Sequence, residues 1–367
     1  MPTCVPIIAA ILACTPAPPS GGNPPPGNIQ PAKQTIKKGI WGPPRFGDHS
    51  LFPTYRDLGV GIWQELIHWD AVARRRPRHA RDPNDRAYRW PGYVDDAVRE
   101  AKRYGIHVSL AIMGSPGWAN GGRPWRYAPR RASDYAYFAR AVARRYPSVN
   151  LFMVWIEPTR RANFRPLVSE VRDRPLSGRM LKGPRKYAQL LDGAYGELKK
   201  EGRENKVIGG NSFVTGDVSP YNWARFMRLP NGRRARMDMW GHNPFGFRKP
   251  RLRDKPLGHG FVDFGTLDEF ARRLDRYQRK GIKLFLSEYT IPTDHENHEF
   301  NFYATKKTQA DFAAAALKIA RKWNRIRTMG WFALFDEAPR PRGDEANRGL
   351  MTYKGEKKPA YDAYKNH

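Results

Sequence analysis

Cysteine is nearly absent from this sequence. Its 367 residues include two, Cys4 and Cys14, and both stand within the first 14 positions. We therefore expect a folded domain without disulfides and without thiol chemistry. A long hydrophobic run is also missing from this region, because Val5–Ala13 is far below the ~18 residues that a membrane span needs. No transmembrane helix is predicted there.

Acidic residues are scarce relative to basic ones. Asp and Glu number 35 against 65 Lys and Arg, which gives a formal net charge of +30. Such a surface favours polyanions: nucleic acid, anionic lipid headgroups or acidic glycans. Most basic residues are scattered Arg, as coding bias also produces, and three clusters stand out: Arg74–Arg78, Arg233–Arg236 and Arg248–Arg253. No zinc spacing, ribonucleoprotein string or heptad is present, which argues against nucleic acid as the partner.

The first residues predict export. Ile11–Cys14 is followed by a Pro/Gly-rich stretch, a pattern typical of a bacterial lipoprotein signal whose cysteine becomes lipidated. We interpret residues 1–14 as a lipoprotein-type or Sec signal peptide, 15–35 as a linker and 36–367 as one domain. The protein is then extracellular or on the cell surface, with Cys14 as its lipid anchor. The leader lacks Lys and Arg and has Leu12 where smaller residues are commoner, so a plain signal peptide stays open.

Strand and helix patterns alternate from residue 38 onwards. The predicted strands are Lys38–Trp41, Val60–Ile67, Ile106–Ile112, Leu151–Ile156, Lys206–Gly210, Met237–Trp240, Ile282–Ser287 and Thr328–Leu334. The predicted helices are Gly92–Tyr104, Ser133–Arg145, Pro184–Lys200, Pro220–Met227, Leu267–Arg279, Thr308–Trp323 and Ala360–Tyr364. Apolar, β-branched strands fit a parallel sheet buried on both faces, so the sequence predicts a single (β/α)8 TIM barrel of the α/β class. An open doubly wound sheet would carry a Gly-rich phosphate turn after an early strand, and none is present.

Two of these strands run into a glutamate. Val154–Thr159 contains Glu157, and Leu284–Tyr289 contains Glu288. A carboxylate at the end of a buried strand is costly for a core and useful for chemistry. In a barrel the carboxyl ends of the strands form the functional face. Two carboxyls held close there are what retaining glycoside hydrolysis needs.

The residues around both glutamates resemble a known group of enzymes. Trp155–Pro158 with Ser287–Tyr289 resembles clan A of the glycoside hydrolases, and four further strings match that clan in the right order. They are Trp69–Val72, Gly114–Asn120, Trp240–Phe245 and Trp331–Asp336. Within this clan the sequence is most similar to family 39, which contains β-xylosidases, α-L-iduronidases and related endoglycosidases. The resemblance implies that Glu157 is the acid/base and Glu288 the nucleophile, with no cofactor.

The resemblance also implies a set of substrate contacts. The expected sugar-binding residues are Trp41, Gln64, Trp118, Asn163, Asn211, His242, Tyr289 and Trp331. No metal site is expected, and the acidic, His-containing stretch Asp294–Glu299 is interpreted as a solvated loop because no tetrahedral ligand spacing occurs in it. We expect a monomer acting on a carbohydrate.

Two departures from the clan pattern bear on activity. Ile156 replaces the Asn that usually contacts the sugar 2-hydroxyl, and Gln64 stands where an Arg commonly supports the nucleophile. Either the substrate lacks that contact, or Asn163 or Asn211 supplies it, or the protein is a weak or inactive relative that binds glycans at the cell surface. For a working pair, we expect carboxyls about 5–5.5 Å apart, with the charge of Glu288 keeping Glu157 protonated to higher pH.

Basic residues follow two of the predicted strands on the functional face. They are Arg160, Arg161 and Arg165 after the fourth strand, and Arg248, Lys249, Arg251 and Arg253 after the sixth. A guanidinium binds a carboxylate through two parallel hydrogen bonds. These residues favour an acidic glycan, such as a uronic-acid polymer, over a neutral one. Coding bias towards Arg is the competing explanation.

Overall fold

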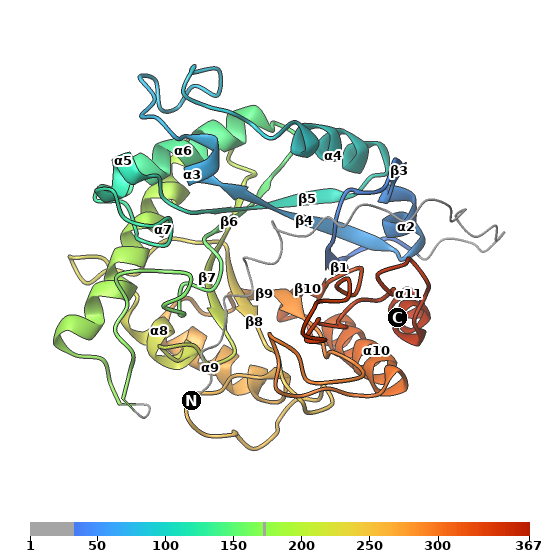
Figure 1. Ribbon diagram of the computed structural model, residues 1–367. Helices are drawn as coiled ribbons and strands as arrows, with labels where there is room; N and C mark the ends of the chain where they lie inside the picture. The colour runs from blue at the N-terminus through green and yellow to red at the C-terminus, as the bar shows by residue number, and fades with distance from the viewer. Residues whose placement is uncertain (1–32, 172–173) are drawn as a thin grey trace.

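The computed structural model describes residues 33–171 and 174–367 (Figure 1). The predicted signal peptide, including Cys14, lies outside the described residues, as does all of the predicted linker except its last three residues. The first strand begins at Thr35, ahead of the predicted start at Lys38, and ends at Trp41 as predicted. No helix in the described ranges combines the length and apolarity that a membrane crossing requires.

Eight parallel strands of the described chain close into a barrel in the order β1-β10-β9-β8-β7-β6-β5-β4. Their bounds are β1 Thr35–Trp41, β4 Val60–His68, β5 His107–Met113, β6 Leu151–Val154, β7 Lys206–Phe213, β8 Met239–Asn243, β9 Lys283–Tyr289 and β10 Ile326–Phe332. A small antiparallel pair, β2 Arg45–Phe46 and β3 His49–Ser50, lies between β1 and β4 in the chain. The predicted single (β/α)8 barrel is confirmed.

Helices surround the barrel (Figure 1). Those longer than one turn are α2 Phe52–Asp57, α4 Gly92–Arg103, α6 Ala132–Arg145, α7 Lys182–Glu201, α8 Pro220–Phe226, α9 Leu267–Tyr277, α10 Lys306–Lys322 and α11 Pro359–Asn366. Single turns form α3 Trp69–Val72 and α5 Gly117–Asn120, with 3₁₀ turns η1 Gly178–Leu181 and η2 Phe264–Thr266. In α4 the buried residues are Val94, Ala97, Val98 and Ala101, the spacing that puts one apolar stripe against the sheet.

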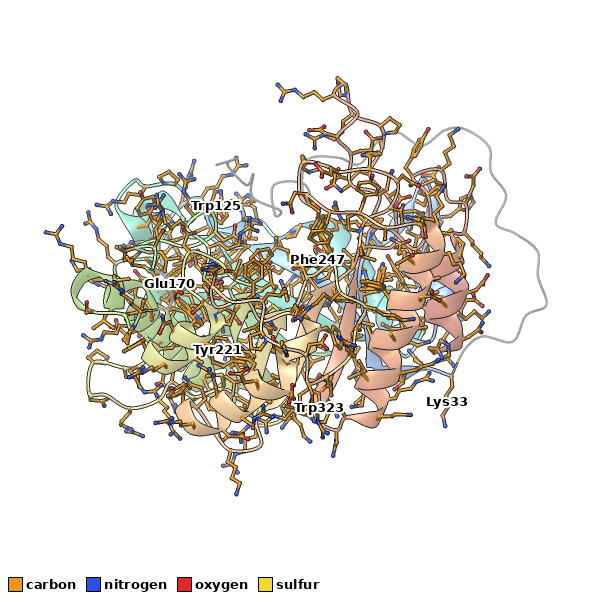
Figure 2. The ribbon with its side chains drawn as sticks, turned by 90° about the horizontal axis from the view of Figure 1, so that it is seen from below. Lys33, Trp125, Glu170, Tyr221, Phe247 and Trp323 are labelled. Carbon is orange, nitrogen blue, oxygen red and sulfur yellow. The ribbon has the colours of Figure 1, made fainter. Side chains whose placement is uncertain are left out.

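The loops at the two ends of the barrel have different roles. In Figure 2, Trp125 and Phe247 belong to segments that follow β5 and β8, on the opposite side from Lys33 and Trp323. Lys33 precedes β1, and Trp323 ends α10, so these two mark the amino-terminal face of the strands. The βα loops that carry Trp125 and Phe247 form the face where barrel enzymes place their sites.

Predicted and observed elements agree in order and differ at their ends. The fourth strand, predicted to run to Ile156, ends at Val154, because the chain turns into a left-handed conformation at Trp155, where φ is 62°. The sixth strand runs to Asn243 rather than Trp240. Helix α2 was not predicted, since its six residues are too few to show a helical period.

Candidate active site

A bulge in β9 sets the direction of Glu288. Met329 of β10 pairs with Leu286, and the next pair is Trp331 with Tyr289. Three steps along β9 therefore match two along β10, so one extra residue is inserted at Ser287–Glu288. Such a bulge breaks strict alternation and re-aims side chains near active sites. Ser287 faces the barrel interior, where its hydroxyl contacts Gln64. Because of the bulge, the side chain of the next residue, Glu288, does not have to point outward as strict alternation would require.

Glu157 lies in a strained turn after β6. The φ angles of Trp155 and Glu157 are 62° and 45°, values that non-glycine residues adopt at a cost of about 1–3 kcal/mol each. Neighbouring groups hold this turn in place. The Trp155 indole N–H donates to the carbonyl of Asn163 at 2.8 Å, and the amide of Asn211 donates to the carbonyl of Trp155 at 2.6 Å. Strain of this kind persists where the surroundings fix it, often at functional sites.

Three donors converge on the carboxylate of Glu157. Arg160 Nη1 and Asn163 Nδ2 reach Oε2 at 2.9 and 3.3 Å, and Asn243 Nδ2 reaches Oε1 at 3.0 Å. Glu157 is fully buried, and Arg160 is 6% exposed, so the ion pair lies in a medium where charge-assisted hydrogen bonds are strong. The Arg160 guanidinium lies 4.5 Å from the ring centroid of Phe213. Asn163 was expected as an alternative polar neighbour of Glu157, and that contact is present.

Asn243 also contacts the second glutamate. Its Oδ1 accepts a hydrogen bond from the backbone N–H of Glu288 at 3.1 Å. One amide at the end of β8 thus joins the end of β9 to the turn after β6. The two glutamates therefore lie at one location on the functional face, as their positions at strand ends predicted.

Burial and nearby carboxylates dominate the electrostatics of Glu288. Burial raises the pKa of Glu288 well above its usual value, the charges of Glu157 and Glu299 raise it further, and Arg160 and Arg348 oppose the change. Within the described ranges no side chain donates a hydrogen bond to its carboxyl group. Glu288 therefore holds its proton to higher pH than an exposed carboxyl group does.

Two predicted contact residues hold the backbone beside Glu288. The indole N–H of Trp41 and the amide of Gln64 both donate to the carbonyl of Ser287, at 3.1 and 2.8 Å. The hydroxyl of Ser287 donates back to Gln64 Oε1 at 3.2 Å. Gln64 thus fixes the chain before the predicted nucleophile, although it brings no charge to the carboxylate.

His242 lies between the barrel and the helix layer. Its Nε2–H donates to the carbonyl of Val262 at 2.7 Å, so Nδ1 accepts from the hydroxyl of Ser212 at 2.9 Å. The ring packs against Phe270 of α9 with centroids 5.1 Å apart. Burial lowers its pKa to about 4. His242 does not touch either glutamate, and its neighbour Asn243 does, since successive strand residues point to opposite faces.

Tyr289 and Trp331 lie on the same outer side. Their rings meet edge to face at 6.0 Å, Tyr289 packs on Phe264 of η2, and Trp331 packs towards Tyr364 of α11. Both are fully buried aromatic core residues. Phe332, one position after Trp331, lies 4.6 Å from the guanidinium carbon of Arg348. By alternation it is Phe332 that faces the functional side at the end of β10.

Trp118 and Asn211 also lie apart from the carboxyl groups. Trp118 Nε1 donates to the carbonyl of Ala73 at 2.7 Å, and Arg76 covers its ring at 4.7 Å. Asn211 lies in a bulge of β7, with φ 38°, and its amide donates a hydrogen bond to the carbonyl of Trp155. Trp118 therefore fastens α5 to the segment after α3, and Asn211 fastens the turn that carries Glu157.

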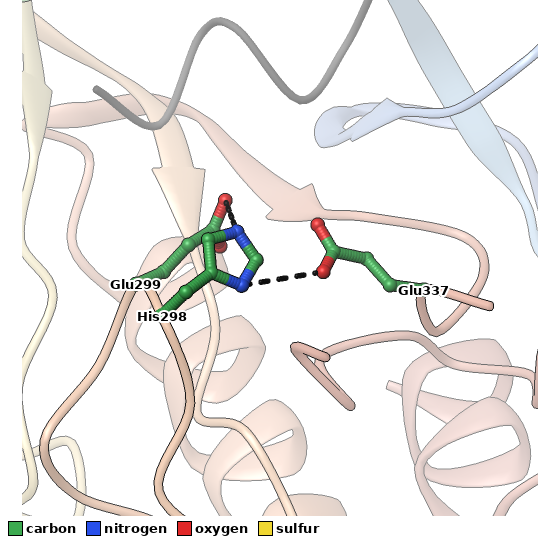
Figure 3. A group of neighbouring side chains, drawn as sticks. All are labelled: His298, Glu299 and Glu337. Carbon is green, nitrogen blue, oxygen red and sulfur yellow. Dashed lines mark ion pairs between the residues drawn. The ribbon is translucent and has the colours of Figure 1, made fainter. Parts of the chain in front are cut away.

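A buried charge cluster lies beside Glu288 in the loops after β9 and β10. Figure 3 shows His298, Glu299 and Glu337, whose possible ligand atoms lie within 4.8 Å of one another. Arg348 Nη1 pairs with Glu299 at 2.6 Å and with Glu337 at 3.1 Å. A guanidinium thus already supplies the positive charge that a metal ion would bring. Burial raises the pKa of Glu299 to about 7.

The interpretation of Asp294–Glu299 as a solvated loop is wrong for its last two residues. The side chain of Glu299 is fully buried, and that of His298 is 10% exposed. Glu299 turns inward because Arg348 offers it a buried ion-pair partner. Asp294 and Glu296 are exposed, as expected.

Solved structures with the same fold were found by comparison. No protein-family model and no curated protein matches the chain. A family 39 glycoside hydrolase from Bacteroides cellulosilyticus has a TM-score of 0.62 at 17% identity, over 91% of this chain and 63% of that one. A glucosidase from Croceicoccus marinus has a TM-score of 0.62 at 14% identity, over 92% of this chain and 66% of that one. A monomeric β-xylosidase from Caulobacter crescentus has a TM-score of 0.56 at 15% identity, over 92% and 68%.

These comparisons bear on the fold. This chain spans slightly less than two thirds of the length of the first two proteins. A xylanase 10B from Thermotoga petrophila, solved with xylobiose, is matched over 98% of its length and 93% of this chain, with a TM-score of 0.55 at 16% identity. The chain therefore has the closed (β/α)8 barrel fold that is found in these glycoside hydrolases.

Proposed function

We propose that the protein is a retaining glycoside hydrolase that cleaves O-glycosidic bonds of a poly- or oligosaccharide. The observation that carries the proposal is the pairing of Glu157 and Glu288 through Asn243 at the carboxyl ends of the strands. Two adjacent carboxyl groups on this face of a barrel are the equipment of glycoside hydrolysis. The glycosidases that share the fold add support.

The reaction proceeds by double displacement. Glu288 attacks the anomeric carbon while Glu157 gives its proton to the leaving oxygen, so the glycosidic C–O bond breaks as an ester to Glu288 forms. Glu157 then removes a proton from water, whose oxygen displaces Glu288 and releases the sugar with its original anomeric configuration. Proton and bond changes balance within the two carboxyls and one water.

The resting arrangement has to change before the first step. Arg160 pairs with Glu157, and both carboxyls are buried, so a sugar reaches them only if Arg160 is displaced. A hydrogen bond to a charged group contributes roughly 1.5–3 kcal/mol, an amount that contacts to a bound sugar can offset. Displacement of Arg160 frees Oε2 of Glu157 to contact the leaving oxygen of the sugar.

Glycan binding without turnover is the second candidate. One observation favours it: both carboxylate oxygens of Glu157 already accept hydrogen bonds from Arg160, Asn163 and Asn243, so neither oxygen is open to a leaving group. The Ile at position 156 adds to this, since it offers no hydrogen bond to a sugar hydroxyl.

Substrate and setting complete the proposal. The substrate is a carbohydrate, with an acidic glycan favoured by the net charge of +30. The protein acts as a monomer outside the cell or at its surface, anchored there through Cys14 if the signal is of the lipoprotein type. No cofactor takes part in the steps above.

Release of reducing sugar from plant and bacterial polysaccharides tests the proposal, with wild type beside the Glu288→Gln variant. We expect release by wild type alone, and the anomeric signal of the fresh product in an NMR time course should keep the configuration of the substrate. An inverted product would contradict double displacement. Equal binding by both proteins without release from any polysaccharide would establish the glycan-binding function instead.

A further inference from the structure

We propose that a basic cavity on the functional face binds an acidic stretch of the glycan chain. This inference rests on the proposed function and names its substrate class. The cavity has a volume of about 570 Å³ and lies between the loop after α5, the segment after Glu157 and the start of α7. Six basic residues and no acidic residue line it: Arg123, Arg130, Arg165, Lys182, Arg185 and Lys186.

The six cations of the cavity are not neutralised by acidic side chains. None of them forms an ion pair within the described ranges, whereas several arginines that the sequence singled out are neutralised. Arg160 pairs with Glu157, Arg161 lies 3.9 Å from Asp217, and Arg248 pairs with Asp263 at 2.7 Å. The cavity therefore keeps its full positive charge.

Local contacts fix two of the cations in place. Lys186 Nζ donates to the carbonyl of Arg130 at 2.9 Å. Burial lowers the pKa of Lys186, and the charge of Asp134 opposes that change. The Arg123 guanidinium lies 5.2 Å from the ring centroid of Tyr127. A bound anion would supply the acidic partner that the lining lacks.

The cavity lies on the functional face because of the direction of α7. A helix of a (β/α)8 barrel runs back against the strands, so the first turn of α7, with Lys182, Arg185 and Lys186, is at the carboxyl ends of β6 and β7. The positive dipole end of this 20-residue helix adds to the charge.

Backbone pairing joins the cavity to the turn that carries Glu157. Arg165 N–H donates to the carbonyl of Arg126, and Ala128 N–H donates to the carbonyl of Arg165, both at 2.8 Å. Arg165 therefore belongs both to the cavity wall and to the loop that begins at Glu157. The cavity and the proposed acid/base therefore share one loop of the functional face.

The dimensions favour a sugar chain over nucleic acid. A volume of 570 Å³ lies within the ~300–1,000 Å³ of small-ligand sites, too small for a duplex. Tyr127 offers a ring and Gln189 an amide at the lining, groups that suit pyranose rings and hydroxyls. Guanidinium groups bind carboxylates in bidentate fashion, which points to uronic acids.

The test measures binding of oligogalacturonate and, as a neutral probe, xylo-oligosaccharide of equal length to the full protein by calorimetry. The variant is Lys182→Gln with Arg185→Gln, two exposed cavity residues, and the matched control is Arg74→Gln with Arg75→Gln, exposed and unpaired elsewhere. We expect the cavity variant to lose about tenfold in affinity for oligogalacturonate, with a smaller dependence on salt. The control should keep wild-type affinity, and neutral binding should be equal in all three proteins.

Equal losses in both variants would overturn the inference, because they would mean that net charge alone attracts the probe. The inference would also be overturned if a single-stranded oligonucleotide bound more strongly than oligogalacturonate and the cavity variant weakened the binding of both equally. The proposed function fails separately: if no glycan is cleaved while the cavity variant still selectively loses oligogalacturonate, the binding site stands and the catalytic proposal does not. Equal melting temperatures of the three proteins show that the substitutions left the fold intact.

Discussion

The side-chain amide of Asn243 donates a 3.0 Å hydrogen bond to Oε1 of Glu157. The other end of that amide accepts from the backbone N–H of Glu288. Asn243 cannot rotate its amide by half a turn without placing an oxygen against the Glu157 carboxylate and an NH₂ against an N–H. Its orientation is therefore determined by both partners, and any change in it moves the two glutamates relative to each other.

Replacing Asn243 by Asp should reduce kcat/KM by about 10²-fold or more while the barrel remains folded. The new carboxylate can still accept from Glu288 N–H but repels Glu157, so the positions and protonation of both acids are disturbed. Steady-state kinetics with circular dichroism provide the measurement. Asn231→Asp, in an exposed loop, adds the same charge as a control, and an equal fall in that variant would contradict a specific role for Asn243.

The sequence predicted the barrel because each strand is an apolar, β-branched run and each longer helix carries its own period. It also placed Glu157 and Glu288 correctly at strand ends. It failed on the side-chain directions at those ends. The predicted sixth strand stopped at Trp240, so its alternation was not followed to Asn243, and His242 was chosen instead. Trp331 was preferred to Phe332 through the family resemblance, against the direction that the strand imposes.

Other features had no local signal. The bulge at Ser287–Glu288 arises from the pairing of β9 with β10, a relationship between residues distant in sequence. The ion pair between Arg160 and Glu157 depends on the left-handed turn at positions 155 and 157, and the conformation of that turn is fixed by Asn211. Packing across strands decides such geometry, and a single sequence does not record it.

Glu288→Gln should abolish turnover and raise stability at neutral pH. The folded-state pKa of Glu288 is raised by burial and by Glu157, so the folded protein binds its proton more tightly than the unfolded chain does. The stability that Glu288 contributes is therefore fully present at low pH and is lost as the pH rises above the pKa of the unfolded chain, about 4.5. We expect urea unfolding to give equal stability for wild type and variant near pH 4 and a more stable variant at pH 8. Turnover should fall at least about a thousandfold.

Glu65→Gln should stabilise the protein at alkaline pH by about 3 kcal/mol. Glu65 is buried in β4, and burial raises its pKa from 4.5 to about 7, opposed by the hydrogen bond from Leu66 N–H. A raised carboxyl pKa means that wild type loses stability as the pH rises from about 4.5 through 7. Gln keeps the acceptor for Leu66 without the charge. Urea titrations at pH 4.5 and 8.5 measure the difference, and the exposed Glu296→Gln should show none.

Removal of divalent ions should leave the melting temperature and turnover unchanged. Arg348 pairs with both Glu299 and Glu337 and supplies the charge that a cation would bring to His298. Dialysis against a chelator followed by calorimetric scanning measures this. The assignment would be contradicted if the isolated protein contained stoichiometric Zn²⁺ or Mn²⁺ and if removing that ion lowered the melting temperature by several degrees.

Replacing Arg348 by Met should in contrast destabilise the protein by about 3–5 kcal/mol, because two buried carboxyl groups lose their partner.

Arg160→Gln should move the acidic limb of the kcat/KM profile to higher pH. The positive charge of Arg160 lowers the pKa of Glu288 and so opposes the rise that burial causes. Since a carboxyl group attacks the anomeric carbon only when it is ionised, the variant should become active at a higher pH than wild type. Gln retains a donor, which limits disturbance of the buried site.

Arg161→Gln is the control for this experiment. Arg161 is the next residue along, it is exposed, and its nearest acid is Asp217 at 3.9 Å. The same net charge is removed without touching Glu157, so its pH profile should match that of wild type. Coincident profiles for Arg160→Gln and wild type would show that Arg160 does not act on the group that titrates. An equal shift of the acidic limb in both variants would assign the effect to net charge rather than to the position of Arg160.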